Sequence, residues 1–515
     1  MSTVYVPADS AARSVGADQV AAAIELQAAR RGCVVDIVRN GSREMTWLEP
    51  LVEVACPDGR VGYGPVAPGD VAGLFDAGFL AGGSHELGHG RTEQIAWLAA
   101  QDRLTFSRVG VIDPRSAQGY QAHGGLVALR RALSMTPQQI CDEVTASGLR
   151  GRGGAGFPVG AKWRTVLDAP GSPKFVTCNA DEGDSGTFAD RMLMEGDPFM
   201  LVEAMLIASI AVGAHEGLVY IRSEYPDAVA MVRAAIASAY QGGWLGRRVL
   251  GTDHGFDLEV RVGAGAYICG EETAMLESME GKRGVVRAKP PLPATQGLFG
   301  RPTVVNNALS LASVLVVLAR GAHFYRDFGV GRSRGTQVFQ LAGNVARGGI
   351  VETAFGITLA QMPDQFGAGT ASGRPVRAVQ VGGPLGAYLP PSAFDLPLDY
   401  EAFEQAAAMV GHGGIVVFDD TVDMAVQARF AMEFCAAQSC GKCTPWRIGA
   451  VRGVEVIDAI IAGQEVAAHV VLLQDLCELM AGGSVCALGA LTPMPVRSVL
   501  ADFAEDLDRS VGARP

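Results

Sequence analysis

The chain has 515 residues. A chain of this length is too long to fold around a single hydrophobic core, so we expect three or four domains. Hydrophobic residues make up 49% and charged residues 19%, a balance typical of folded rather than disordered protein. The formal net charge of −12 repels phosphate backbones and argues against nucleic acid as a partner, although backbone N–H groups can still bind a nucleotide cofactor.

Ten cysteines are spread over the chain, and five of them lie near its C-terminal end. The first residues lack the basic and apolar regions of a secretion signal. The longest apolar stretches, near residues 205–213 and 309–319, are too short to span a bilayer. We therefore expect a cytoplasmic protein with no transmembrane segment, whose cysteines are reduced thiols or metal ligands rather than a disulfide framework.

Residues 1–110 are expected to form a small α/β unit. Helical periodicity covers residues 11–31, and a β-rich run follows at residues 33–38. A Pro-Asp-Gly turn at residues 57–59 separates two further apolar runs, which predicts a hairpin.

Residues 111–330 alternate helical segments, short strands and glycine-rich loops. This alternation predicts an α/β domain around a mostly parallel sheet. The expected helices cover residues 137–147, 197–212 and 228–239, and the expected strands cover residues 174–178 and 218–221.

Beyond residue 330 the pattern changes twice. β-rich runs at residues 336–342, 378–381 and 415–418 predict a small β-grasp-like domain over residues 331–423. Residues 424–515 are expected to be helical, with cysteines between and on the helices.

Residues 148–158 form the densest glycine run and contain a G-x-G-x-x-G pattern that starts at Gly151. A helical segment precedes the pattern, whereas the usual dinucleotide fingerprint follows a strand, so we reject that interpretation. Bare N–H groups, together with Arg152 and Lys162, still suit a phosphate group. A flexible surface loop is the alternative.

Three further runs carry polar side chains. The acidic run at residues 178–188 follows a predicted strand, where α/β sheets place ligand loops, and its carboxylates suit ribityl or ribose hydroxyls. The runs at residues 263–273 and 302–307 end in paired acids and paired asparagines. Taken singly, the three runs are more typical of a solvated turn, a helix start and a helix cap, respectively.

Together and in this order, the four runs resemble the flavin subunit of NADH:quinone oxidoreductases. Relatives of that subunit include the diaphorase subunits of NAD-coupled hydrogenases and of NAD-dependent formate dehydrogenases. The resemblance covers about residues 115–500, and it is specific because several separate motifs agree in order and spacing. It implies that FMN and NAD are cofactors and that the flavin performs the chemistry, with no catalytic acid or base from the protein.

The resemblance also implies a set of binding residues. The glycine loop and Lys162 would bind the FMN phosphate, and the polar runs would complete the flavin site. The implied flavin-binding residues are Gly151, Arg152, Gly153, Lys162, Asn179, Asp181, Glu182, Tyr267, Gly270, Glu271, Asn306 and Asn307. The implied NAD(H) contacts are Phe157, stacking on adenine, with Glu272, Lys289 and Asp184. Two family phenylalanines that sandwich adenine are Thr165 and Leu292 here, so we expect an altered adenine geometry.

The N-terminal unit separates these relatives. It holds only Cys33 and Cys56, too few for the fused [2Fe–2S] domain common in hydrogenase diaphorases, which needs about four thiolates. A cluster-free, thioredoxin-like extension with residues 5–10 and 38–43 resembles the β subunit of NAD-dependent formate dehydrogenases. Two further segments share that resemblance, residues 183–188 and 491–495.

The formate dehydrogenase resemblance implies two partners, a molybdenum-containing formate-oxidising subunit and a small [2Fe–2S] subunit. The close alternative is the flavin subunit of an NAD-coupled hydrogenase or of an NADH:quinone oxidoreductase. An alternative of a different class is a cluster-free, nucleotide-binding assembly subunit.

The cysteines near the C-terminal end suggest a metal centre. Cys440 and Cys443 form a C-x-x-C and Cys486 lies further on, which suits an iron–sulfur cluster or zinc, while a bare C-x-x-C can also be redox-active. The family pattern, C-x-x-C-x-x-C with a distant fourth cysteine, implies a [4Fe–4S] cluster. Here Trp446 stands at the third position, and its indole N–H cannot ligate iron.

Three hypotheses remain for this centre. A three-cysteine cluster forms, with a missing iron or with another ligand. Cys435 or Cys477 rearranges to substitute, although cysteines on apolar helices are usually buried core thiols. Or the site binds no cluster.

The expected architecture is α/β and multidomain, in four parts. These are a thioredoxin-like extension over residues 1–110, an FMN/NAD-binding α/β domain over 111–330, a β-grasp connector over 331–423, and a helical iron–sulfur domain over 424–515.

Overall fold

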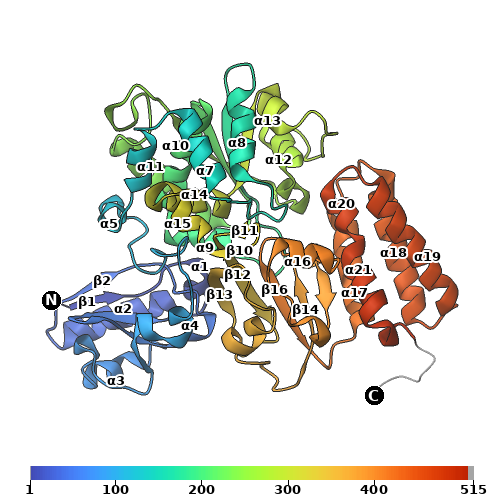
Figure 1. Cartoon of the computed structure of the whole chain (residues 1–515). Coiled ribbons are helices and arrows are strands. Elements are labelled where there is room, and N and C mark those ends of the chain that lie inside the picture. Colours follow the sequence, from blue (N-terminus) through green and yellow to red (C-terminus); the bar gives the residue numbers. More distant parts are fainter. Residues whose placement is uncertain (1, 509–515) are drawn as a thin grey trace.

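Three larger β-sheets and a bundle of helices follow one another along the chain, as the computed structural model describes for residues 2–508 (Figure 1). In the view of Figure 1 the parallel sheet and its helices lie at the top. The N-terminal unit lies at the lower left, the third sheet at the lower centre and the helical bundle at the right. The fold is therefore the multidomain α/β class that the sequence predicts.

The first sheet has the strand order β2-β1-β3-β4-β5, with β1 and β2 parallel and the other pairs antiparallel. The predicted hairpin is confirmed, because Cys56 at the end of β3 pairs with Gly59 at the start of β4. The elements of this unit are β1 (Ser2–Tyr5), α1 (Ser10–Ser14), α2 (Ala17–Arg30), β2 (Val35–Val38), β3 (Val52–Cys56), β4 (Gly59–Tyr63), α3 (Val71–Asp76), β5 (Gly88–Arg91) and α4 (Ala96–Ala99).

The helix predicted over residues 11–31 is two helices in the structure. α1 ends and α2 begins on either side of Gly16, whose φ of 104° is incompatible with a continuous right-handed helix. Helical periodicity does not reveal this break, since the apolar face continues in α2 through Val20 and Ile24.

The second sheet has the order β8-β7-β6-β9, and all its neighbouring strands are parallel. The prediction of a mostly parallel sheet is confirmed. Its strands are β6 (Phe175–Ala180), β7 (Glu216–Ile221), β8 (Asp257–Val262) and β9 (Thr303–Asn307). Its helices are α5 (Ala117–Ala122), α6 (Val127–Ala132), α7 (Pro137–Ala146), α8 (Val159–Asp168), α9 (Ala189–Gly196), α10 (Pro198–Val212), α11 (Pro226–Gln241), α12 (Glu272–Met279), α13 (Pro293–Gln296), α14 (Ala308–Arg320) and α15 (Ala322–Arg326).

Two elements of this domain show how the hydrophobic pattern of a segment relates to its burial. α10 is apolar on nearly all sides and is buried on nearly all sides, against α14, α6 and β6. β8 was missed by the sequence prediction because it is an edge strand in which apolar residues alternate with Asp257, Glu259 and Arg261.

The third sheet has the order β13-β12-β16-β14-β15, with β12 and β16 parallel. The N-terminal unit docks on it, because Trp97 Nε1 donates to the Ile350 carbonyl oxygen at 3.1 Å. Its elements are β12 (Thr336–Gly343), β13 (Gly349–Ala354), β14 (Val376–Val381), β15 (Ala387–Leu389), α16 (Tyr400–Gln405) and β16 (Gly414–Asp419), preceded by the small ribbon β10 (Gly329–Val330) and β11 (Ser333–Arg334).

The C-terminal part is a bundle in which α18 packs against both α17 and α19. Its helices are α17 (Met424–Gln438), α18 (Thr444–Ile461), α19 (Val466–Gly483), α20 (Ala487–Leu491) and α21 (Pro493–Asp502). Within the described residues, α19 alone is long and apolar enough to cross a membrane, a test that is weak evidence for a single helix. Its contacts with α18, α20 and α21, and the charges of Asp475 and Glu478 within it, favour a bundle helix.

Candidate functional site

Three of the four polar runs meet at the carboxyl edge of the parallel sheet. The acidic run leaves the end of β6, the run at residues 263–273 leaves the end of β8, and Asn307 ends β9. The register aligns these ends, since Asn179 pairs with both Tyr220 and Asn307. This edge is where open α/β sheets bind ligands.

The glycine run lies over the end of β9. The N–H of Gly151 donates to the Phe157 carbonyl oxygen at 2.8 Å, which closes the loop immediately before α8. A Cβ on Gly153 would lie 2.9 Å from Cβ of Asn307, so this close approach requires glycine. The N–H groups of Gly151 and Arg152 already have acceptors, since Arg152 donates to Oγ of Ser310 at 2.7 Å, so a phosphate would have to use the N–H groups that follow them in the run.

The Arg152 side chain turns away from this loop. It is buried and donates to the carbonyl oxygens of Thr336, Arg334 and Arg150 and to the Tyr325 hydroxyl. The other predicted phosphate cation is Lys162 on α8, whose Nζ lies 3.6 Å from a carboxylate oxygen of Glu272. The same Nζ donates to the Val305 carbonyl oxygen at 3.0 Å.

Asp181 is the acid that faces open space. With Arg222, Tyr267 and Phe434 it lines a cavity of about 100 Å³, and its Oδ2 is buried with no hydrogen-bond partner among the described residues. Burial raises the pKa of Asp181 to about 7, although the charge of Arg222 opposes the shift. An unpartnered buried acceptor that lines a cavity is the feature expected where a cofactor rich in hydroxyl and N–H groups binds.

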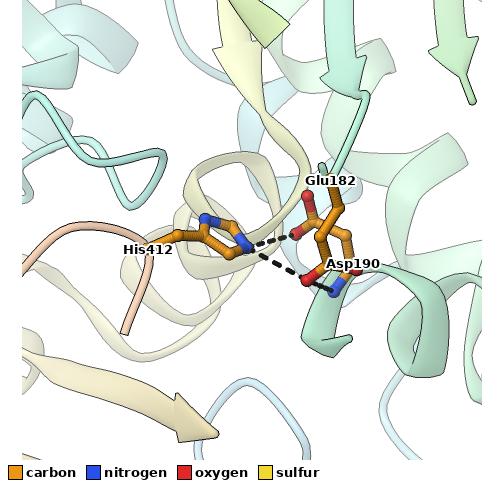
Figure 2. Close-up of side chains that lie close together, drawn as sticks. All are labelled: Glu182, Asp190 and His412. Atoms are coloured by element: carbon orange, nitrogen blue, oxygen red, sulfur yellow. Dashed lines mark hydrogen bonds and ion pairs between the residues drawn. The ribbon is translucent and has the colours of Figure 1, made fainter. Parts of the chain in front are cut away.

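Glu182, the next residue, points into the protein instead. Its two carboxylate oxygens accept from the N–H groups of Asp190 and Arg191, both at 3.1 Å. Figure 2 shows the imidazole of His412 opposite Glu182 and Asp190, and Nε2 lies 3.3 Å from Oε1 of Glu182 and 3.5 Å from Oδ1 of Asp190. Glu182 was predicted to contact the flavin, but here its side chain belongs to this buried group.

The charges in this buried group are set by competition. Burial alone would lower the pKa of His412, but the carboxylates of Asp190 and Glu182 outweigh it and hold the pKa well above its usual value. Burial would raise the pKa of Glu182, yet the hydrogen bond from His412 keeps it below its ordinary value. Nδ1 of His412 lies 2.9 Å from the Arg152 carbonyl oxygen. The three residues are metal-ligand types, but an imidazolium already offsets one of the two carboxylate charges, and burial raises the pKa of Asp190, which reduces the other.

Tyr267 and Asp184 form the next wall. The Tyr267 hydroxyl donates to Oδ1 of Asp184 at 2.7 Å, and a Cβ on Gly183 would lie 2.6 Å from the tyrosine ring. The ring meets Phe434 of α17 edge-on, with 4.9 Å between ring centroids. The helical bundle therefore contributes to the same cavity as the acidic run.

The remaining residues singled out from the sequence fall into three groups. Asn179, Gly270, Asn306 and Asn307 join scaffold elements: Asn179 donates to the Gly270 carbonyl oxygen at 2.8 Å, Asn306 accepts from Trp163 at 2.8 Å, and Asn307 caps α14. Glu271 and Glu272 share Lys289, whose Nζ lies 2.9 Å and 2.7 Å from them. Phe157 is 54% exposed, Leu292 is 53% exposed and Thr165 is also exposed, which leaves these surfaces free for an adenine ring.

The three predicted metal ligands lie together at one end of the bundle. Cys440 and Cys443 precede α18 and Cys486 precedes α20. Burial raises the pKa of the Cys486 thiol, and Glu271, Cys440 and Cys443 add to the rise, so these groups are within electrostatic reach. Lys442 Nζ donates to the Val286 carbonyl oxygen at 2.6 Å, which fastens the cysteine loop to the segment after α12.

The two proposed substitutes lie elsewhere. Cys435 is buried, and its thiol hydrogen-bonds with Thr492, while Cys477 feels the charge of Arg497. Both therefore belong to the packing against α21. Trp446, on the first turn of α18, is only 1% exposed. The residues present therefore fit a cluster with three thiolate ligands and do not fit one with four.

Sequence reasoning missed four residues of these sites. Arg222 and Glu224 follow β7 directly, and the position of that predicted strand was a usable signal. His412 and Phe434 come from the third sheet and the bundle, and no local pattern points to them.

The comparisons with known proteins agree with this geometry. A family model described as the Nuo51 FMN-binding domain matches residues 144–316. A second, described as the NADH-ubiquinone oxidoreductase-F iron-sulfur binding region, matches residues 426–510. A crystal structure of an NAD⁺-reducing [NiFe]-hydrogenase in the air-oxidised state superposes with a TM-score of 0.69 and 28% identity, covering 100% of this chain and 86% of that one.

Two relatives are similar over most of their length. The HndC component of the NADP-reducing hydrogenase of Solidesulfovibrio fructosivorans is 42% identical over 411 residues, which covers 80% of this chain and 84% of the relative. The F 2 component of the NADH-quinone oxidoreductase of Rhizobium meliloti is 43% identical over 401 residues, which covers 78% of this chain and 95% of the relative.

Fold and sites together define a flavin-dependent oxidoreductase subunit with an attached iron–sulfur region. The chain belongs to the family of the F components of NADH-quinone oxidoreductases, whose members include subunits of NAD(P)-reducing hydrogenases. FMN, NAD and the [4Fe–4S] region are thereby confirmed as features of the family to which it belongs, although this chain keeps three of the four cysteines.

Proposed function

We propose that the chain is the subunit through which a larger complex exchanges electrons with NAD(H), and that the complex oxidises formate. The observation that carries the electron-transfer role is the contact between its two halves. Phe434 of the bundle and Tyr267 of the flavin domain share a cavity wall, and Lys442 of the cysteine loop bonds to Val286. The flavin loops and the thiolates are therefore held in one rigid arrangement.

In this proposal each part of the site has a binding task. The N–H groups of the glycine loop and Lys162 hold the FMN phosphate, and Asp181 accepts hydrogen bonds from the cofactor. Phe157 stacks on adenine, Glu272 and Lys289 contact the nucleotide, and Asp184, which accepts a hydrogen bond from Tyr267, is a further contact. FMN, when bound, would accept a hydride and release its electrons singly, and the hydride transfer itself needs no acid or base from a side chain.

The N-terminal unit supports the choice of formate. Its two resembling segments lie side by side, since the Ala8 N–H donates to the Asn40 carbonyl oxygen and the Ser42 N–H donates to Asp9 at 2.6 Å. Ser10 in turn bonds to Glu195 of the flavin domain, at 2.6 Å from its N–H. The segments that resemble the formate dehydrogenase β subunit thus form the contact that fixes the extension on the flavin domain.

The proposed partners are a molybdenum-containing formate-oxidising subunit and a small [2Fe–2S] subunit, in the cytoplasm. A second candidate function is the flavin subunit of an NAD-coupled hydrogenase, which the full-length structural similarity to an NAD⁺-reducing [NiFe]-hydrogenase favours. A quinone-reducing complex fits the relatives equally well.

The test uses the chain purified with whatever subunits accompany it. NADH should bleach the flavin absorbance under anaerobic conditions, and formate with NAD⁺ should then yield NADH. Hydrogen, supplied in place of formate, should yield none. NADH formed from hydrogen and not from formate would transfer the assignment to the hydrogenase class. A folded chain that retains no FMN when the cofactor is in excess would contradict the flavin role itself.

A cluster-free assembly role gives a distinct result. Such a chain would contain neither iron nor sulfide, and its flavin, if bound, would reduce a dye with NADH but pass no electrons to the accompanying subunits. Iron and sulfide analysis of the purified chain therefore separates this alternative from the proposal.

A further inference from the structure

We propose that the iron–sulfur region of this chain holds a [3Fe–4S] cluster bound by Cys440, Cys443 and Cys486, with Trp446 closing the corner where a fourth iron would need a ligand. The inference rests on the iron–sulfur region of the proposed function and not on formate as the substrate. It names a cluster type that differs from the [4Fe–4S] type of the matched family region.

The first step is the count of available thiolates. Cys435 bonds with Thr492, and Cys477 lies near Arg497 on the side of α21. Both are fully buried in the bundle core, so bringing either to the site would require α17 or α19 to repack. Three thiolates therefore remain.

The second step concerns a single metal ion. A tetrahedral zinc, with Zn–S bonds of about 2.3 Å, would place its sulfur ligands roughly 3.8 Å apart. In residues 2–508, a set of three candidate ligand atoms all within 4.8 Å of one another occurs only at Glu182, Asp190 and His412, so the three cysteine sulfurs are spread more widely. Wider spacing suits a polynuclear cluster better than one ion.

The third step is the place that Trp446 takes. It lies three residues after Cys443, on the first turn of the helix that Cys443 immediately precedes. A Cβ on Gly489 would lie 3.1 Å from Cε3 of the indole and 2.8 Å from Ser484, so the ring packs on the loop that carries Cys486. Trp446 thus packs against the segment that carries Cys486, three residues along the chain from Cys443.

The fourth step is that this corner lacks any substitute ligand. The indole has no lone pair for iron, and Trp446 is only 1% exposed, so the residue at this corner supplies no ligand. A cavity of about 560 Å³ reaches the site and is lined by Cys440, Arg283 and Arg447, and Trp446 is not among its lining residues. An iron at the Trp446 corner would have only sulfide ligands, so the cluster without that iron is favoured.

The fifth step concerns two buried polar groups that lack a hydrogen-bond partner. Nε1 of Trp446 and Oγ of Ser484 are both buried, and neither has a hydrogen-bond partner among the described residues. Buried donors of this kind are normally satisfied. Loss of one iron leaves bridging sulfides that accept hydrogen bonds, and such bonds also raise the reduction potential of a cluster.

The experiment uses the full chain, produced without partner subunits so that no other cluster contributes. Iron, acid-labile sulfide and FMN are measured, and EPR spectra are recorded before and after reduction. We expect iron below sulfide in the ratio of the formula, and a cluster signal in the oxidised protein. Trp446→Cys should bring iron level with sulfide and move the signal to the reduced protein.

Three controls make the outcome specific. Trp446→Phe keeps the ring but removes the donor, so the oxidised signal should remain while the reduction potential falls. Cys477→Ser should leave the signal unchanged, and Cys486→Ser should abolish it. Equal iron and sulfide with a signal only after reduction of the unmodified chain would overturn the inference, as would zinc or the absence of metal. Bleaching of the flavin by NADH in the same sample shows that such a failure leaves the flavin role intact.

Discussion

Two neighbouring acids have opposite environments at the edge of the parallel sheet. Asp181 has an unpartnered oxygen in a cavity, whereas Glu182 is satisfied by two backbone N–H groups and a histidine. Both are acidic and both follow β6, so the sequence pattern alone predicts the same role for the two residues. Their difference arises because adjacent side chains leave an extended segment on opposite sides.

Asp181 predicts a pH dependence of flavin binding. Because the pKa of Asp181 is raised to about 7 in the flavin-free chain, its accepting carboxylate is gained as pH rises through that value. FMN affinity, measured by quenching of flavin fluorescence, should therefore increase between about pH 6 and pH 8. Asp181→Asn should flatten this dependence. An identical slope in the variant would show that another group is responsible.

His412 predicts a pH dependence of stability. Its pKa is raised on folding, so its stabilising contribution is complete below the ordinary value of about 6.5 and is lost as pH rises through the folded value. His412→Gln leaves two buried carboxylates without their cation and should cost about 3 kcal/mol near pH 6. The penalty should shrink at alkaline pH.

Thermal unfolding at a series of pH values measures this effect. His123→Gln is the matched control, because His123 is exposed and pairs only with a carbonyl oxygen of its own helix. A penalty for His412→Gln that does not change with pH would mean that the histidine is neutral in the folded chain.

At the scale of elements, the glycine loop depends on its contact with β9. Gly153→Ala would place a methyl group 2.9 Å from Asn307, so the loop must move away from the strand end. Overpacking of this kind costs about 1–3 kcal/mol. We expect FMN affinity to fall by roughly tenfold or more, a change of about 1.4 kcal/mol or more.

Gly69→Ala is the control for this loop, since a Cβ there meets nothing within 4 Å and its φ is unrestricted. Equilibrium titration of both variants with FMN gives the comparison. Equal affinity in Gly153→Ala and the unmodified chain would place the phosphate away from this loop.

At the scale of the whole molecule, the sequence predicts what depends on local pattern. The parallel sheet, the hairpin at β3 and β4, and the gathering of polar runs at one edge follow from strand patterns and loop positions. Edge strand β8 was not predicted, because its alternating charged residues resemble a surface segment. His412 and Phe434 were not predicted for another reason. His412 comes from the third sheet and Phe434 from the helical bundle, so only tertiary packing brings them to the flavin domain.

Arg152 shows how this long-range packing determines a residue's role. As an arginine inside a glycine loop it predicts a phosphate ligand, yet its guanidinium joins the flavin domain to the third sheet through Thr336 and Arg334. A buried arginine of this kind supports the loop from behind. Lys162, by contrast, stays partly accessible beside it.

Two variants distinguish a residue that supports the glycine loop from one that contacts the FMN phosphate directly. Arg152→Lys cannot reproduce the planar set of donors, so it should destabilise the fold by about 2 kcal/mol and weaken FMN binding as a consequence. Lys162→Met should weaken FMN binding by roughly tenfold, about 1.4 kcal/mol, with little change in the unfolding temperature. Differential scanning calorimetry and FMN titration on the same samples give both quantities. If Arg152→Lys lost affinity with an unchanged unfolding temperature, its guanidinium would have to reach the phosphate, and the assignment of the two cations would be reversed.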